Sequence, residues 1–200
     1  MLDKDLLEFG QKFHGHKCPA VPMGLRAALA AMKKLGVERA PDGQLMALIE
    51  LDEDHRGTCF ADGVQVATGC TLGKGNIKKL HYGKWGLTLI DKKNKKAVRV
   101  SLKAEAMKKN MESEFAKLRS SGAPASKVPA EVVDPLVEIV SNAPDEALLN
   151  IGEVFDYDWQ DAPHTFESVV CEACGEMTVT RNARVKGGKV VCIPCSGYGR

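Results

Sequence analysis

The sequence lacks several features that would place it in a simple functional class. Its 200 residues carry a formal net charge of only +2, so no global charge points to nucleic acid or anionic lipid. No apolar run approaches the roughly 20 residues of a membrane span, and no internal repeat is present. The start MLDKDLLEFG is acidic, unlike the basic and then apolar layout of a signal peptide. These absences predict a soluble, cytoplasmic protein without a membrane partner.

Apolar residues make up 44% of the chain, enough for one well-packed domain with a small appendage. Helical spacing of apolar residues, with Asp3 as an N-cap, predicts a first helix that ends near Gly15. A second helix is expected to begin between Pro19 and Pro22 and to run to Gly36. Further helices are predicted over residues 58–69, around residues 107–118, at 129–142 with a kink at the internal proline, and just after residue 144.

Strand signals lie between these helices. The segment QLMALIELDE is almost continuously apolar, as expected of a strand buried on both faces. WGLTLID and KAVRVSLK alternate around the turn KKNKK and predict a hairpin, and GEVFDYDW predicts a last strand. The elements together predict an α+β core, with helices packed on a mostly antiparallel sheet, over residues 1–165.

The strongest motif of the sequence lies near the C-terminus. Cys171-x2-Cys174 and Cys192-x2-Cys195 are separated by seventeen residues, and the segment between them is typical of a hairpin that turns at Gly187. This is the spacing of a four-cysteine zinc site, and four thiolates leave no coordination position for water. We therefore predict a structural zinc ribbon at residues 166–200. Unliganded buried cysteines, or a redox pair, explain two such pairs around one hairpin less well.

The ribbon has some positive charge but lacks the other signal of a nucleic-acid module. Arg181, Arg184, Lys186 and Lys189 are cationic, but no aromatic residues are interleaved with them as a platform for base stacking. The sequence accordingly favours a ribbon that binds protein or caps the fold over one that binds nucleic acid.

Three cysteines remain outside the ribbon, and one of them lies in a histidine-rich segment, FHGHKCP. Cys18 comes just before the second helix, whose N-terminal N–H groups favour a thiolate, and His16 lies two residues earlier. Cys59 would share a helix face with Asp62 and Cys70 and could approach Cys18. Imidazole and thiolate together suit zinc, nickel or iron.

Three ligands, His16, Cys18 and Cys59, would leave one position of such a metal open, as catalysis or ligand binding requires. In a catalytic role Cys18 and Cys59 would act at the metal, and His14 or His55 would move protons. The alternative is that these cysteines are small apolar core residues and that the histidines only satisfy backbone groups.

The loop GCTLGKGN resembles a phosphate-binding loop but fails on spacing and lacks the hydroxyl residue after its lysine. Lys74 and the flexible backbone amides of the loop could still hold an anionic group.

Three motifs in order, FHGHKCP, C-x2-DG-x-Q-x2-TGCT-x-GKGN and YGK, resemble the E subunit of formylmethanofuran dehydrogenase and its stand-alone relatives, several of which carry a C-terminal four-cysteine ribbon. The resemblance spans roughly residues 9–90, with the ribbon as a second block. It implies an α+β homodimer with a cleft in which His16, Cys18 and Cys59 are the metal ligands. The residues that it implies as cleft or supporting positions are His14, Asp62, Gln65, Thr68, Cys70 and Lys74.

One departure from the family pattern concerns access to that cleft. Ala20 stands where the family usually has glycine, and Pro22 is an addition, so the turn after Cys18 could be stiffer.

The resemblance also implies a role beside a molybdenum or tungsten oxidoreductase, as an accessory subunit or a metal-handling factor. No molybdopterin-binding region is visible in the sequence, so that redox chemistry would belong to other subunits. Two alternatives stay open: a metal- or cysteine-dependent enzyme acting on a small molecule in the cleft, and a ribbon-driven nucleic-acid adaptor.

Overall fold

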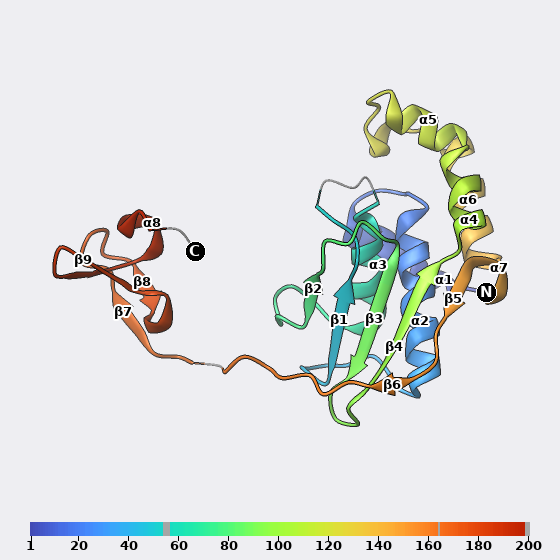
Figure 1. The fold of residues 1–200 in the computed structure, drawn as a ribbon. Coiled ribbons are helices and arrows are strands. Elements are labelled where there is room, and N and C mark those ends of the chain that lie inside the picture. Colours follow the sequence, from blue (N-terminus) through green and yellow to red (C-terminus); the bar gives the residue numbers. More distant parts are fainter. Residues whose placement is uncertain (54–56, 164, 199–200) are drawn as a thin grey trace. The chain divides into compact units, whose positions relative to one another are not determined.

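The structure is a computed structural model and describes residues 1–53, 57–163 and 165–198. The chain divides into two compact units, Met1–Trp159 and Gln160–Arg200, and each is described by itself (Figure 1). Within the described residues, no helix has the length and apolar character needed to cross a membrane.

The first unit has helices on one face of a mixed, mostly antiparallel sheet, as the sequence predicted (Figure 1). The strand order is β2-β1-β3-β4-β5, β6 pairs with β4, and only β1 and β2 run parallel. The strands are β1 (Leu45–Ile49), β2 (Ile77–Lys79), β3 (Gly86–Asp91), β4 (Lys96–Leu102), β5 (Leu149–Ile151) and β6 (Phe155–Asp156). The helices are α1 (Lys4–His14), α2 (Ala20–Leu35), α3 (Cys59–Thr68), α4 (Ala104–Met111), α5 (Glu114–Ser120), the 3-10 turn η1 (Ala125–Lys127), α6 (Ala130–Asn142) and α7 (Asp145–Leu148).

Helix α2 is the centre of the core because it packs on α1, α3 and α6 as well as on the sheet. Most of its residues are buried, including Val21 and Leu25, and the strand β1 is buried along its whole length. On the opposite face of the sheet, Met46 and Ile90 form a smaller apolar cluster with Tyr157 and Trp159 packed against it.

Two glycines allow α2 and α3 to approach backbone to backbone. A Cβ atom at Gly24 would lie 2.0 Å from the carbonyl oxygen of Phe60, and one at Gly63 would lie 2.2 Å from that of Val21. Any larger residue would force the helices apart, since real Cβ atoms do not come so close to other atoms. This close packing holds Cys59, the first residue of α3, near the start of α2.

The structure corrects two details of the predicted elements. The helix expected around residues 107–118 is two helices, α4 and α5, because the hydroxyl of Ser113 accepts a hydrogen bond from the Ala116 N–H (3.2 Å) and begins a new helix. The strand expected in GEVFDYDW is only the two-residue β6, and a separate strand, β5, precedes it.

The second unit consists of two small hairpins and a short helix. β7 (Ser168–Val170) pairs with β8 (Met177–Val179), and after the 3-10 turn η2 (Thr180–Asn182) β9 (Arg184–Lys186) pairs with β10 (Lys189–Val191). Gly187 and Gly188 both have positive φ, 58° and 78°, which confirms the predicted glycine turn. Helix α8 (Ile193–Ser196) follows β10.

Candidate metal centre and its two pockets

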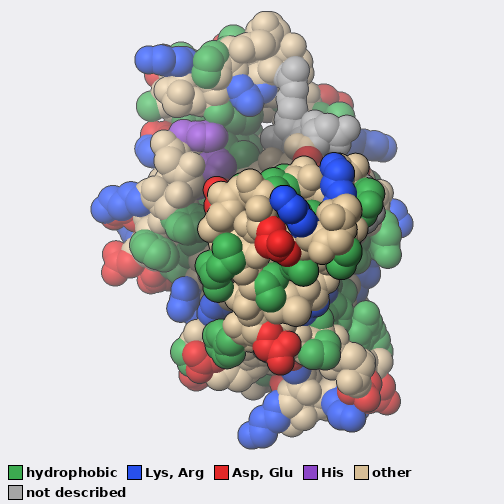
Figure 2. All heavy atoms as spheres, turned by 90° about the vertical axis from the view of Figure 1, so that its left-hand side faces the viewer, with side chains coloured by type: hydrophobic (Ala, Val, Ile, Leu, Met, Phe, Trp, Pro, Cys, Tyr) green, Lys and Arg blue, Asp and Glu red, His purple; other side chains and the backbone are tan. Residues whose placement is uncertain are grey.

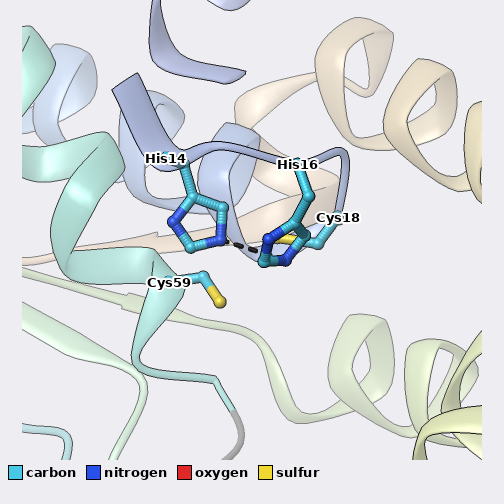
Figure 3. A group of neighbouring side chains, drawn as sticks. All are labelled: His14, His16, Cys18 and Cys59. Carbon is cyan, nitrogen blue, oxygen red and sulfur yellow. Dashed lines mark hydrogen bonds between the residues drawn. The ribbon is translucent and has the colours of Figure 1, made fainter. Parts of the chain in front are cut away.

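Four side chains from three segments of the first unit converge on one point. One ligand atom each of His14, His16, Cys18 and Cys59 lies within 4.8 Å of every other (Figure 3). His14 is the last residue of α1, His16 and Cys18 lie in the connection to α2, and Cys59 begins α3. We call these four residues the His/Cys cluster. The structure thus brings His16, Cys18 and Cys59 together and adds His14 to them.

The position of His14 follows from how α1 ends. Gly15 adopts the left-handed conformation (φ 91°) that closes the helix, and its N–H donates to the Gln11 carbonyl oxygen. The His14 side chain is only 10% exposed, and its Nδ1 lies 2.7 Å from Oδ2 of Asp62. Its other ring nitrogen, Nε2, lies 3.1 Å from Nε2 of His16 (Figure 3).

Asp62 is itself held in place by a chain of hydrogen bonds. The Gln65 amide Nε2 donates to Asp62 Oδ1 (3.0 Å), and the Leu72 N–H donates to Gln65 Oε1 (3.1 Å). Asp62 and Gln65 lie three residues apart and therefore on the same side of α3. The loop after α3 thus positions Gln65, which positions Asp62, which positions His14.

The pKa values of the two cysteines shift in opposite directions because their side chains are hydrogen-bonded to each other. The Cys18 thiol donates to the Cys59 sulfur, and this hydrogen bond, opposed by burial and helped by the neighbouring His14, lowers the pKa of Cys59 to about 4. The same hydrogen bond, together with burial, raises the pKa of Cys18, although the backbone N–H groups of Val21 and Ala20 act in the opposite direction. The N–H groups at the helix start thus act in the expected direction on Cys18, but the hydrogen bond to Cys59 and burial outweigh them.

The pKa values of the two histidines also shift in opposite directions. The hydrogen bond to Asp62, followed by one to Cys59, raises the pKa of His14 to about 9. Burial lowers the pKa of His16, and so does the positive charge of His14 beside it. Without a metal, these shifts favour an imidazolium on His14 between the Asp62 carboxylate and a thiolate on Cys59.

The spacing of the donors fits a metal ion. In a tetrahedral zinc site with bonds of about 2.0–2.3 Å, neighbouring ligand atoms are about 3.3–3.8 Å apart. The two imidazole nitrogens, 3.1 Å apart, are close to this spacing, and all four donors lie within 4.8 Å of one another. The Asp62–His14 pair is also the carboxylate support that metal-bound histidines commonly have.

Two hollows whose linings differ in charge border the His/Cys cluster. The first, the charged pocket, has a volume of about 660 Å³. It is lined by side chains of both charges, among them His14, Asp62, Glu53, Lys78 and Lys79. The second, the α4–α5 pocket, has a volume of about 250 Å³ and is mostly apolar. Cys59 lines both pockets, whereas His16 and Cys18 line only the second. Histidine side chains are visible at the molecular surface in Figure 2.

Three of the predicted cleft residues belong neither to the cluster nor to the chain of hydrogen bonds that positions His14. Thr68 is buried and donates to the Val64 carbonyl oxygen, and Cys70 follows the end of α3 as a buried thiol whose pKa is raised by burial. Lys74 donates to the carbonyl oxygens of residues 40 and 41 and so ties its loop to the segment before β1. His55, considered as a proton carrier, lies outside the described residues.

Sequence reasoning missed the wall of the α4–α5 pocket. The spacing of Met107, Met111 and Phe115 indicates core positions only, and nothing in the sequence singles out Arg119 or Trp85. The one sequence feature that could have indicated this wall is the row of apolar residues followed by a single arginine. No sequence pattern, however, predicts that this row lies beside Cys18.

The cysteines of the second unit form a compact group of their own. The four sulfurs of Cys171, Cys174, Cys192 and Cys195 lie within 4.8 Å of one another, and those of Cys174 and Cys192 are 4.0 Å apart. The backbone N–H of Cys192 donates to the Cys171 sulfur (3.3 Å), which lowers the pKa of Cys171 to about 6. Such N–H bonds stabilise thiolates, so this group is suited to a metal ion.

The cations of the ribbon make contacts within their own unit. Arg181 donates to the Pro163 carbonyl oxygen, Arg184 to that of Ala183, and Lys186 to that of Cys195.

The comparison with known proteins agrees with the motifs. Residues 13–150 match a family described as FmdE, molybdenum formylmethanofuran dehydrogenase operon. The chain belongs to the FmdE family. The match contains all four residues of the His/Cys cluster together with Asp62.

Two relatives of this FmdE-family chain extend beyond the matched residues. A crystal structure of a tungsten formylmethanofuran dehydrogenase FmdE-like protein from Syntrophus aciditrophicus has a TM-score of 0.63 and 25% identity, and the similarity covers 97% of this chain and 91% of that one. A probable S-adenosyl-L-methionine-binding protein of Archaeoglobus fulgidus is 36% identical over 202 residues, which are 96% of this chain and 52% of that protein. The chain thus spans about half the length of that relative.

Proposed function

We propose that this protein is a metal-binding member of the FmdE family with two separate metal centres. The ribbon holds a structural zinc ion on Cys171, Cys174, Cys192 and Cys195. The His/Cys cluster holds a second transition metal, for which zinc, nickel and iron are the candidates. The observation that carries the proposal is the convergence of four nitrogen and sulfur donors from three chain segments, with His14 oriented by Asp62.

The sequence suggested three ligands and one open coordination position for the second centre, whereas the structure offers four donors. With His14 as a ligand, protein atoms alone would fill a tetrahedral shell and join the end of α1, the start of α2 and the start of α3. With His14 only as a neighbour, three ligands remain and one position stays open. The bound metal would supply charge and, in the open form, a Lewis acid beside Cys59.

Metal analysis of the purified protein tests this proposal. We expect about two equivalents of metal per chain in the wild type, and about one in Cys18→Ser and in Cys59→Ser. Cys70→Ser is the matched control, because Cys70 is also a buried cysteine of the first unit but lies outside the cluster. A wild-type value near one, held by the ribbon, would leave the His/Cys cluster as a thiol site.

By family membership, we further propose that the protein serves a molybdenum or tungsten oxidoreductase as an accessory subunit or metal-handling factor. The homodimer and the cytoplasmic location belong to this proposal, and a solution mass of twice 21.6 kDa would support the dimer. Co-purification of the protein with such an oxidoreductase, lost in Cys18→Ser, would support the accessory role.

A second function, an enzyme acting on a small molecule, is favoured by one observation: Cys59 lines both pockets. Its test is turnover of a small substrate that Cys59→Ser abolishes while the circular dichroism spectrum stays unchanged. The nucleic-acid adaptor predicts binding that weakens steeply with salt.

A further inference from the structure

We propose that the α4–α5 pocket binds a small organic anion, with its apolar body against α4 and α5 and its anionic group at Arg119. This inference rests on the proposed function in one respect, since residues of the proposed metal centre form one wall of the pocket. A small organic anion bound there would lie beside the proposed metal centre.

The lining of the pocket fixes the apolar part of the ligand. Its apolar side chains are Met107, Met111 and Phe115 from α4 and α5, and Trp85 from the segment before β3. Cys18, just before α2, and Cys59, at the start of α3, also line it. Drug-sized ligands occupy pockets of about 300–1,000 Å³, so a volume of about 250 Å³ suits a smaller molecule. Methionine side chains adapt to apolar ligands of varied shape, which favours a flexible chain or a small ring.

The charge of the pocket fixes the polar part. Among the described residues that line it, Arg119 is the only one with a permanent charge, and none is a carboxylate. Arg119 donates to the Ala123 carbonyl oxygen, which holds its guanidinium at the end of α5. Its positive charge also contributes to lowering the pKa of His16, so it lies within electrostatic reach of the His/Cys cluster.

The neighbouring metal centre would not replace Arg119 as the source of attraction. Two thiolates and two neutral imidazoles around a divalent ion have no net charge, so Arg119 is the cation that an anionic group would meet among the described residues of this pocket. The charged pocket differs, because Glu53 and Asp62 offset the lysines there. An anion with an apolar body is therefore expected to select the α4–α5 pocket, where a carboxylate can accept paired hydrogen bonds from a guanidinium.

Calorimetric titration of the purified, metal-containing protein with octanoate tests this inference. Octanol has the same chain length without the charge, and acetate has the charge without the chain. We expect octanoate to bind saturably, octanol to bind more weakly, and acetate to bind more than about a hundredfold more weakly, since each buried methylene contributes about 0.8 kcal/mol. Equal binding of octanol and octanoate would overturn the proposal, and so would no binding of octanoate.

Substitutions locate the bound anion. Arg119→Gln should weaken octanoate binding about tenfold or more, as expected for a lost charge-assisted hydrogen bond, and Arg119→Lys should restore part of it. Lys117→Gln is the matched control, because Lys117 is an exposed cation on the same helix that does not line the pocket. Unchanged binding in Arg119→Gln would refute the assignment.

A spectroscopic readout keeps the test separate from metal binding. The chain has two tryptophans, so Trp159→Phe leaves Trp85, which lines the pocket, as the only one. Octanoate should then change the fluorescence of Trp85 with the affinity measured by calorimetry, and a silent Trp85 would place the anion elsewhere. Metal content is measured on the same samples. Octanoate binding at one metal per chain would contradict the proposed metal centre and leave the anion pocket standing.

Discussion

Asp62 offers a sharp test of how the His/Cys cluster is held. Its carboxylate lies 2.7 Å from Nδ1 of His14 and also accepts from the amide of Gln65. In Asp62→Asn only one oxygen remains. In one orientation the new NH₂ group faces the His14 Nδ1–H, and in the other it faces the Gln65 amide NH₂. Both of these partners are donors, so one hydrogen bond is lost in either case. The substitution therefore removes both the charge and one hydrogen bond without removing volume.

The expected effect is a weaker hold on the cluster metal with little loss of fold. Loss of a partner that orients a metal-bound histidine typically costs 10- to 100-fold in metal affinity, which corresponds to about 1.4–2.8 kcal/mol. The Asp62 side chain is 31% exposed, so solvent screens part of its charge. We therefore expect a value near the lower end, about tenfold.

Competition with a chromophoric chelator measures this affinity, and the ribbon metal of the same chain is the internal reference. Asp156→Asn is the control, since Asp156 is an exposed aspartate that pairs with Lys96 on the surface. Cluster affinity in Asp62→Asn equal to that of the control would refute the orienting role of Asp62. A weakened ribbon metal would show that the substitution had disturbed the protein more widely.

Three further predictions concern packing, protonation and the ribbon. Gly24→Ala should lower the free energy of unfolding, measured by urea titration, by about 1–3 kcal/mol or more, because the new methyl group would overlap the Phe60 carbonyl. Gly73→Ala is the control and should have little effect, because there is open space around Gly73. In the metal-free protein, NMR should show His14 titrating near pH 9 instead of 6.5. Its raised pKa means that the stability it contributes is complete below pH 6.5 and is lost as the pH rises towards 9, so unfolding curves without that loss would contradict the assignment. Cys192→Ser should release one metal per chain and melt the second unit while the circular dichroism of the helical unit persists; loss of both metals would contradict the separation of the two centres.

The predicted helices and the hairpin agree well with the structure because local patterns determine them. The Asp3 cap, the apolar stripe up to Gly36 and the alternation around KKNKK each specify an element within a few residues. The break between α4 and α5 was missed because the apolar spacing continues across Ser113. There a single capping hydroxyl decides where one helix ends and the next begins.

The site was harder to predict than the helices, since its geometry depends on long-range packing. The grouping of His16 and Cys18 could be inferred from their spacing, and Cys59 from a motif. The role of His14 as a fourth donor depends on the left-handed turn at Gly15, which aims the last residue of a helix at the same point as the loop beyond it. Motif spacing also grouped Lys74 with the cleft, whereas in the structure it bonds to the carbonyl oxygens before β1.

X-ray absorption spectroscopy of the wild-type protein with two zinc ions per chain tests the central claim most directly. A two-sulfur, two-nitrogen cluster and a four-sulfur ribbon average to three sulfurs at about 2.3 Å and one nitrogen at about 2.0–2.1 Å per zinc. We expect this average in the wild type, and sulfur alone in Cys18→Ser at one zinc per chain. A shell of four sulfurs in the wild type, without imidazole scattering, would contradict a metal centre at His14, His16, Cys18 and Cys59.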